Sequence, residues 1–286
     1  MNGRLLMAHR RRLLLPPPRV LFSNNHLLAV DKPPGWSSIP TKEYRNKSLL
    51  HHLKRQELGG GSQNDFLVPL HRIDQPCSGV LLFAKTSKAA KRITAAWKKQ
   101  LVQKTYICRC SNLLLQHNST RLEEQDEDTN NGDWWILEGW MKKQPGQRSV
   151  TMFSSPEPDS RHCRLLWRRV MLDDDDDDDD DNSKNNNQRF LEVRTDMGAR
   201  HMIRALVSRI GHSPIDGDLR YGAAHALPDK SVALHAHTVT LPPSLQLGDL
   251  TQRHFSSPIP DTWRSYFHTH HQQLQERLST RAPHKF

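Results

Sequence analysis

The fold of this chain is constrained most by a succession of short extended segments with few helical ones between them. Patterns of strand length recur at 66–70, 80–84, 104–110, 134–141, 149–153, 162–171 and 232–241, and two more surround an Asn-Asn turn near residue 24. Helical periodicity is confined to 48–58, 86–101, 199–210 and 261–278. Many short strands with few helices predict an α+β domain, built on a mixed or antiparallel β-sheet flanked by helices.

Two polar stretches interrupt these patterns. Nine consecutive aspartates at 173–181 are followed by an asparagine-rich stretch. Like charges repel and the stretch has almost nothing apolar to bury, so we expect a disordered insertion at 173–188. Strand patterns resume at Phe190 without a new start, which places this insertion inside one domain spanning 19–286. Residues 112–132 are also polar and acidic, and they predict an insertion at the surface.

The charge balance points to an acidic partner. The chain has 41 Lys and Arg against 31 Asp and Glu, a formal charge of +10, and the aspartate run alone supplies nine of the acids. The remaining chain is therefore much more basic than the total suggests. Nucleic acid is the first expected partner and a membrane surface the second. A generally soluble basic protein remains an alternative.

Several protein classes can be excluded from composition and spacing. No segment approaches the roughly 18 apolar residues of a membrane-spanning helix, so no membrane is expected. The four cysteines, 77, 108, 110 and 163, form no CxxC pair, which favours reduced thiols in an intracellular protein. The 17 histidines show no metal-ligand spacing, so we expect no metal site.

The first 18 residues predict either a basic arm or a transit peptide. Five arginines and no acid lie among the first 20 residues, and three prolines break the apolar run. Arginine-rich, acid-poor starts are typical of organelle transit peptides. We expect a mitochondrial protein, with the plastid and the cytoplasm as alternatives. In the cytoplasmic alternative, the arm would contact RNA phosphates.

The first segment that carries chemistry is HRIDQPCSG, at 71–79. In extended chain, Arg72 and Asp74 point to the same side. A basic neighbour keeps a carboxylate ionised, and an ionised Asp in a cleft can act as nucleophile or general base. A surface ion pair beside a turn is the alternative from these residues alone.

Two further segments stand out. In Lys104-Thr105-Tyr106, a lone tyrosine on a strand is usually a packing residue. In the segment 198–222, Arg200 and Arg204 lie four apart on the expected helix, beside its core stripe. Two guanidinium groups there would bind phosphate or hold a carboxylate bidentately.

Together these segments resemble the RluA-like family of RNA pseudouridine synthases. HRIDQPCSG is similar to the family's HRLDxxTSG signature, and NHLLAVDKPPG at 25–35 to its opening motif. KTY at 104–106 matches the strand with the active-site tyrosine, and GARHMIR with GHSPIDGDLRYG resembles the last motif. Four motifs in family order cover roughly 20–265. Three residues depart from the family pattern: Cys77, Ala199 and Met202. The S4 RNA-binding domain of some relatives is expected to be absent.

The resemblance implies the pseudouridine synthase catalytic fold and the conversion of uridine to pseudouridine in tRNA or rRNA. No cofactor is implied, because the reaction is an isomerisation, and we expect a monomer. The implied catalytic residues are Asp74, the arginine that pairs with it, Arg204, and the base-stacking Tyr106. The implied RNA-binding residues are His71, Arg72, Arg200 and His201. A catalytically inactive RNA-binding relative and a hydrolase using Asp74 remain the alternatives.

Overall fold

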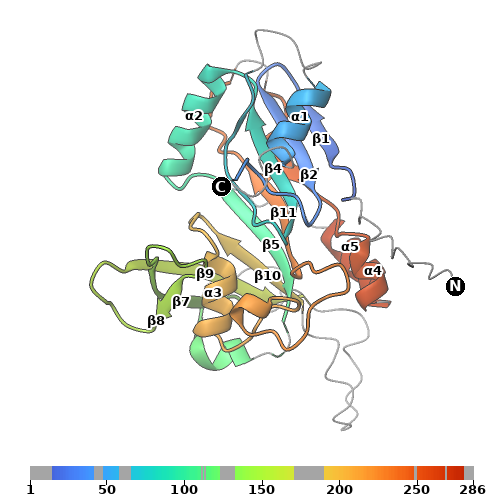
Figure 1. The fold of residues 1–286 in the computed structure, drawn as a ribbon. Helices are drawn as coiled ribbons and strands as arrows, with labels where there is room; N and C mark the ends of the chain where they lie inside the picture. The colour runs from blue at the N-terminus through green and yellow to red at the C-terminus, as the bar shows by residue number, and fades with distance from the viewer. Residues whose placement is uncertain are drawn as a thin grey trace, which may run out of the picture.

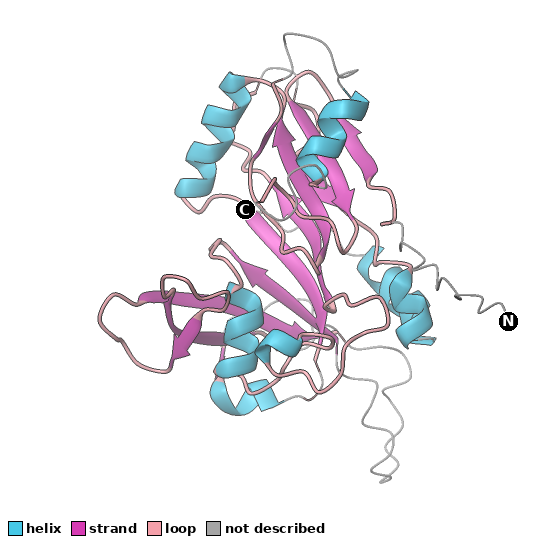
Figure 2. Cartoon of the chain, viewed as in Figure 1, coloured by secondary structure: helices cyan, strands magenta, loops and turns pink. Residues whose placement is uncertain are grey.

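A computed structural model describes residues 15–41, 48–57, 66–110, 112, 114–122, 133–170, 190–247, 250–267 and 269–279. These residues form a twelve-stranded mixed sheet with helices on its faces (Figures 1 and 2). The α+β prediction is therefore confirmed. The expected insertion at 173–188, and the first 14 residues of the expected arm, lie outside the described residues. In the described part of the chain, no helix is both long and apolar enough to cross a membrane.

The main path of the sheet runs β1-β2-β4-β11-β5-β10-β9-β7-β6. One half holds β1 (Arg19–Ser23), β2 (Leu27–Lys32) and β4 (Ser78–Ala84). The other half holds β5 (Gln103–Arg109), β10 (Phe190–Thr195), β9 (Arg161–Arg169), β7 (Trp135–Lys142) and β6 (Thr120–Arg121). β11 (Leu234–Thr240) joins the halves, because it pairs in parallel with β4 and antiparallel with β5.

Three short strands extend the sheet off this path. They are β3 (Val68–Pro69) on β4, β8 (Thr151–Phe153) on β7, and β12 (His254–Ser256) on β11. The helices are α1 (Leu49–Glu57), α2 (Ser87–Lys98), α3 (Met202–Arg209), α4 (Thr262–Phe267) and α5 (Thr269–Ser279). Two short 3₁₀ turns, η1 (Leu114–Asn118) and η4 (Leu219–Tyr221), complete the described elements.

Strand alternation explains how α1 and α2 cover opposite faces of the first half. In β2, Leu28 and Val30 join the core cluster that contains α1, whereas Leu27 and Ala29 join the cluster that contains α2. A strand buried on both faces is a continuous apolar run, which is how β2 and β4 read in the sequence. Thr86 caps α2 by accepting a hydrogen bond from the Ala89 amide, as its sequence predicts.

Three sequence predictions need correction. The helix expected at 199–210 begins only at Met202, because His201 adopts a left-handed conformation, with φ of 59°. The expected helix at 261–278 is two helices. The region 112–132 is not only a surface insertion, because η1 buries Leu115 completely in the core.

Candidate active site

Asp74 lies in the turn that leads into β4, and buried polar contacts hold this turn in place. The Ser38 hydroxyl group bonds both the amide and the carbonyl of the preceding residue, Ile73, at 3.1 and 2.7 Å. The Asp74 carbonyl accepts from the Cys77 amide at 3.0 Å. The Asp74 side chain stays 23% exposed. The backbone is thus fixed while the carboxylate reaches solvent, as a reacting group requires.

The buried lysine Lys32 bonds the backbone of the same turn. Lys32 is fully buried, and its ammonium group donates to the carbonyls of Gln75 and Cys77 at 3.3 and 2.6 Å. It also donates to the carbonyls of Pro33 and Trp36, both at 3.0 Å. Burial lowers the pKa of Lys32 to about 8, although nearby negative groups, Asp74 among them, act in the opposite direction. Lys32 therefore connects the opening motif to the turn that carries Asp74.

Arg204 connects α3 to the turn that carries Asp74. Its side chain on α3 is 4% exposed, and its Nη1 donates to Asp74 Oδ2 at 2.9 Å. The sequence predicts a bidentate pairing of these two residues, and that detail is wrong. The bidentate partner is Asp218, which accepts from Nε at 2.6 Å and from Nη2 at 2.7 Å. Asp218 is 1% exposed. Asp218 therefore fixes the guanidinium plane, and Asp74 receives one remaining nitrogen.

Because Asp218 binds two of the three guanidinium nitrogens, Asp74 can still accept further hydrogen bonds. Among the described residues, Oδ1 of Asp74 accepts no hydrogen bond, whereas Oδ2 accepts from Arg204. We call Asp74, Arg204 and Asp218 the Asp74 cluster; its two carboxylates and one guanidinium have a formal charge of −1. A carboxylate oxygen that has no partner and is partly exposed can attack an electrophilic carbon or stabilise a cation.

His201 completes the surroundings of Asp74. Its Nε2 lies 3.7 Å from Asp74 Oδ2, and its Nδ1 lies 2.9 Å from the Tyr221 hydroxyl group. That hydroxyl also accepts from the Val150 amide at 3.1 Å. Burial lowers the pKa of His201 to about 4, so the ring is neutral at pH 7. The only formal positive charge beside Asp74 in this contact set is therefore that of Arg204.

Tyr106 lies on β5, where it pairs with Ala236 of β11 and packs against the main core cluster. Burial raises its pKa, and the negative charge of Asp74 raises it further. Burial likewise raises the pKa of the Cys77 thiol to about 12. Both groups are therefore protonated at neutral pH. Tyr106 is a planar, uncharged side chain near Asp74, suited to contact with a nucleobase.

The predicted RNA-binding residues are distributed around this site. Arg72 is exposed beside Asp74, and the exposed Arg200 has its Nε 3.4 Å from His201 Nε2. Arg200 precedes α3, so it does not share a helix face with Arg204 as the sequence predicts. His71 stacks on Trp97, with ring centroids 4.7 Å apart, and its Nε2 accepts from the Leu82 amide. Burial lowers its pKa to about 3. An RNA-binding role for these residues stays a prediction.

Sequence reasoning missed Asp218, Lys32 and Tyr221. Each lies inside a motif that the sequence offers, GDLRYG or DKPPG, but nothing in one chain shows which carboxylate an arginine will hold. In the described ranges, no group of three His, Cys, Asp or Glu residues could hold a metal ion. Of the residues predicted from the sequence, the structure places Arg204 and His201 next to Asp74, although Asp74 lies in a distant segment of the chain.

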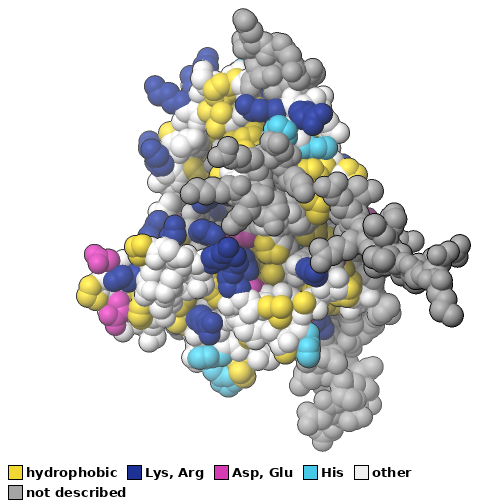
Figure 3. All heavy atoms as spheres, viewed as in Figure 1, with side chains coloured by type: hydrophobic (Ala, Val, Ile, Leu, Met, Phe, Trp, Pro, Cys, Tyr) yellow, Lys and Arg dark blue, Asp and Glu magenta, His cyan; other side chains and the backbone are white. Residues whose placement is uncertain are grey.

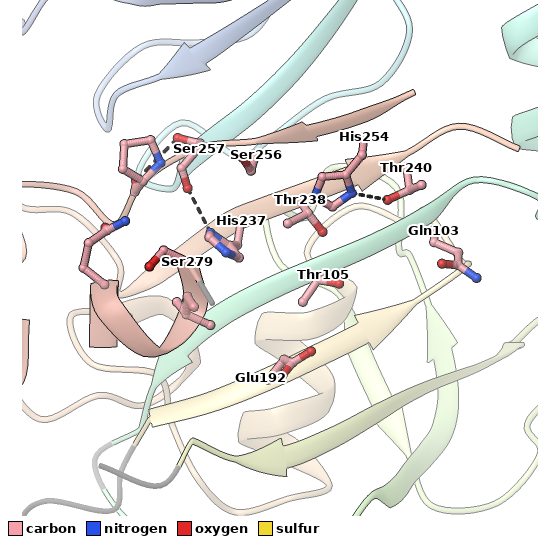
Figure 4. A pocket seen from close by; sticks show the side chains of 13 residues that line it. Gln103, Thr105, Glu192, His237, Thr238, Thr240, His254, Ser256, Ser257 and Ser279 are labelled. Atoms are coloured by element: carbon pink, nitrogen blue, oxygen red, sulfur yellow. Dashed lines mark hydrogen bonds between the residues drawn. The ribbon is translucent and has the colours of Figure 1, made fainter. Parts of the chain in front are cut away.

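A hollow lies on the face of the sheet opposite to Tyr106. It has a volume of about 420 Å³ and is lined by residues such as Thr105, Glu192, His237 and Ser257 (Figure 4). Thr105 and Tyr106 are neighbours on β5, so their side chains point to opposite faces. None of the residues predicted for the active site lines this hollow.

Comparison with known proteins agrees with the geometry. Residues 26–209 match a family model described as RNA pseudouridylate synthase. The tRNA pseudouridine synthase C of Pectobacterium carotovorum subsp. carotovorum is 26% identical over 207 residues, 71% of this chain and 48% of that protein. The human pseudouridylate synthase RPUSD2 is 34% identical over 91 residues, 32% of this chain and 16% of that protein. The chain therefore spans about half the length of these curated relatives, or less.

A solved structure shares the fold. Human RNA Pseudouridylate Synthase Domain Containing 4 superposes with a TM-score of 0.58, at 14% sequence identity. The match covers 93% of this chain and 95% of that one. The likeness concerns the architecture of the sheet and its helices.

Proposed function

The chain belongs to the RluA-like family of RNA pseudouridylate synthases, and on that premise we propose that it isomerises uridine in RNA to pseudouridine. The observation that carries the proposal is Asp74 Oδ1, which accepts no hydrogen bond from the described residues and lies beside a guanidinium that Asp218 holds in place. Isomerisation breaks the bond between the ribose C1′ and the base N1, and it forms a bond from C1′ to the base C5. The base hydrogen displaced from C5 is balanced by one gained at N1.

Asp74 has the decisive role in this proposal. It either attacks the nucleoside covalently or stabilises the cationic sugar while the base turns, and both routes need an ionised oxygen without another partner. Arg204 donates to the carboxylate and holds its orientation. In the proposed complex, Tyr106 on β5 contacts the base. Its raised pKa keeps the hydroxyl group protonated, so the side chain stays uncharged beside Asp74.

The proposed substrate is a folded RNA, either tRNA or rRNA. The name of the Pectobacterium relative favours tRNA, with rRNA as the other outcome of the test. The target uridine has to leave its stack to reach Asp74, which costs a few kcal/mol. Contacts to flanking phosphates can offset this cost. Figure 3 supports such contacts, because Lys and Arg side chains gather across the middle of the face in view.

Pseudouridine mapping of total RNA tests the proposal. Cells that lack the protein are complemented with the wild-type chain or with Asp74→Asn. We expect the wild type, and not the variant, to restore pseudouridine at defined positions. RNA that crosslinks to the wild type while no pseudouridine depends on the protein would identify an inactive RNA-binding relative. Release of free uracil would identify a hydrolase.

We also propose that the first 18 residues direct the protein to the mitochondrion. They contain four arginines and no acid, which is typical of a transit peptide. A fluorescent protein fused after the full chain should colocalise with a mitochondrial marker, and the same fusion without residues 2–18 should not. A diffuse cytosolic signal from the full chain would contradict the proposal. Fluorescence in chloroplasts would identify the plastid instead.

A further inference from the structure

An open pocket of about 460 Å³ lies beside the candidate active site and has no role in the chemistry proposed above. It is bounded by the end of α2, by Leu70 after β3, and by the segment that precedes α3. Its lining includes Trp97, Lys98, Arg161, Asp196 and Gly198. Pockets that bind small groups such as a nucleobase are usually of this size and hold a few convergent polar groups.

The polar groups of this pocket make few contacts within the protein: the Asp196 carboxylate attracts the nearby Lys104 ammonium but forms no ion pair with it. Among the described residues, no hydrogen bond or ion pair involves the Asp196 carboxylate, the Trp97 Nε1, the Lys98 ammonium or the Arg161 guanidinium. Opposite charges therefore line one pocket without forming an ion pair with each other. Unpaired donors and acceptors that surround one space suit a ligand with complementary groups.

The pocket wall is held rigid from behind. His71 stacks on one face of Trp97, and the Lys104 ammonium lies 5.9 Å from the ring centroid. Lys104 also donates to the backbone carbonyls of Asp196 and Met197, which fixes the segment carrying the carboxylate. Gly198 has no side chain to cover Trp97 Nε1, which a Cβ there would approach to 3.8 Å. Trp97 Nε1 therefore lies beside Gly198, at the wall of the pocket.

Chain connectivity places the pocket close to Asp74. Leu70 precedes Asp74 by four residues, and Gly198 precedes His201 by three, so backbone reach limits both separations to about 14 Å or less. The same two segments therefore form the pocket and the active site. A nucleotide close to the target uridine can reach this pocket while the uridine itself lies at Asp74.

We propose that this pocket binds a guanine that flanks the target uridine. Guanine presents two adjacent donors, N1–H and N2–H, to the two oxygens of a carboxylate such as Asp196. Its O6 accepts from a donor such as Trp97 Nε1, and Lys98 and Arg161 neutralise the phosphates on either side. Adenine and cytosine each offer one amino donor group on the same edge, and uracil offers one imino donor between two acceptors, so they satisfy the carboxylate less well. The inference rests on the proposed function and specifies the RNA sequence that it selects.

A randomised RNA pool tests the proposal with the full chain. The pool is a stem-loop with one fixed uridine in its loop and two random nucleotides on either side. Bound RNA and pseudouridine-containing RNA are sequenced separately. We expect the wild type to enrich guanine at one flanking position by about tenfold, the discrimination of one good bidentate contact. Asp196→Asn should abolish the enrichment, because the amide directs a donor at the guanine N–H groups.

Matched variants separate recognition from charge and folding. Asp133→Asn removes a carboxylate that is 52% exposed and pairs with Arg121 of β6, outside the pocket lining, and should keep the enrichment. Trp97→Phe keeps a ring for His71 to stack on and removes the N–H donor, so it should weaken the enrichment. Lys98→Ala should lower the salt dependence of RNA affinity by about one phosphate contact, whereas Lys88→Ala at the start of α2 should not.

The possible results distinguish the two proposals. Pseudouridine formation without guanine enrichment would overturn the pocket assignment and leave the proposed function standing. Unchanged guanine enrichment in Asp196→Asn would overturn the assignment as well. Guanine enrichment in bound RNA that Asp196→Asn removes, with no pseudouridine in the pool or in cellular RNA, would support the pocket and contradict the proposed function.

Discussion

Two clusters of carboxylate and arginine side chains, on opposite faces of the sheet in the described part of the chain, differ in how their charges are paired. In the Asp74 cluster, one arginine bonds two carboxylates. Asp74 keeps 23% of its side chain exposed, and one of its oxygens accepts no hydrogen bond from the described residues. In the second cluster, Glu192 is 3% exposed and each of its oxygens accepts from one arginine. We call Glu192, Arg168 and Arg194 the structural cluster.

The structural cluster is saturated. Arg168 approaches Glu192 Oε2 through Nε and Nη2 at 3.0 and 2.9 Å, and Arg194 approaches Oε1 through the same two atoms at 3.2 and 3.1 Å. Both guanidinium groups also lie over the ring of Trp134, at 4.5 and 4.0 Å. Since every carboxylate oxygen is engaged, this cluster can stabilise a fold and has little capacity left for chemistry. Of the two clusters, the Asp74 cluster alone keeps a carboxylate oxygen that accepts no hydrogen bond from the described residues.

The largest expected effect is that of Asp74→Asn. It should lower the single-turnover rate of pseudouridine formation at least about 10³-fold, because an amide cannot attack or stabilise a cationic sugar. RNA affinity and thermal stability should change little, since Asp218 still neutralises Arg204 after the change. Rates, RNA affinity and melting temperature are measured on the same preparation. A parallel loss of affinity would contradict this division between chemistry and binding.

Arg204→Lys should have the next largest effect, about 10²-fold on the rate and close to that of Arg204→Ala. One ammonium cannot hold the plane of Asp218 and also reach Asp74, so the carboxylate loses its aim although a positive charge remains. Arg209→Lys, an exposed position on the same helix, is the matched control and should behave as the wild type. A near-normal rate for Arg204→Lys would mean that charge alone is enough.

In the structural cluster, Glu192→Gln should affect stability and not chemistry. Leaving a buried arginine without its charged partner costs about 3–5 kcal/mol, whereas the rate per folded molecule should stay within about twofold of the wild type if this cluster has no catalytic part. Glu138→Gln removes a carboxylate that is 54% exposed and should change stability by about 1 kcal/mol or less. Urea unfolding and single-turnover rates provide the two measurements. A large rate loss with normal stability would abolish the distinction between the clusters.

The smallest expected effect is that of Arg200→Ala. This exposed residue stands next to Ala199, where the family pattern has an arginine. Its loss should reduce the salt dependence of RNA affinity by about one phosphate contact and leave the rate at saturating RNA unchanged. Affinity is measured across a salt series. Equal slopes for wild type and variant would show that Arg200 contacts no phosphate.

Much of the fold follows from the sequence, because strand alternation and apolar runs report burial directly. The prediction of the strand at 80–84, within β4, and of a helix that begins near residue 86, which is α2, depends on neighbouring residues only. The start of α3 was misplaced because the left-handed conformation of His201 accompanies contacts to Tyr221, 20 residues away. The helix break between α4 and α5 had no recognised local signal.

The candidate site was predictable only in part. The motif order identified Asp74 and Arg204, and the structure confirms their contact. The sequence does not predict the role of Asp218. Asp74, Asp216 and Asp218 all lie in loop-like motifs, and nothing in the sequence shows which of them pairs with Arg204. Asp216 instead pairs with Arg109 of β5. Which acid an arginine holds is decided by tertiary geometry, and periodicity contains no information on it.

The place of β11 in the sheet has a consequence for how the protein is made. β11 lies between β4 and β5, yet about 150 residues separate it from the end of β4 in the chain. At roughly 5–20 residues per second, a ribosome takes about 8–30 s to synthesise that stretch. During this interval the edge of β4 that will pair with β11 has no native partner. For most of that time Arg204 has not been synthesised, so Asp74 also lacks its partner. A nascent chain truncated before β11 therefore cannot assemble the complete native sheet, even though it already contains Asp74 and Arg204.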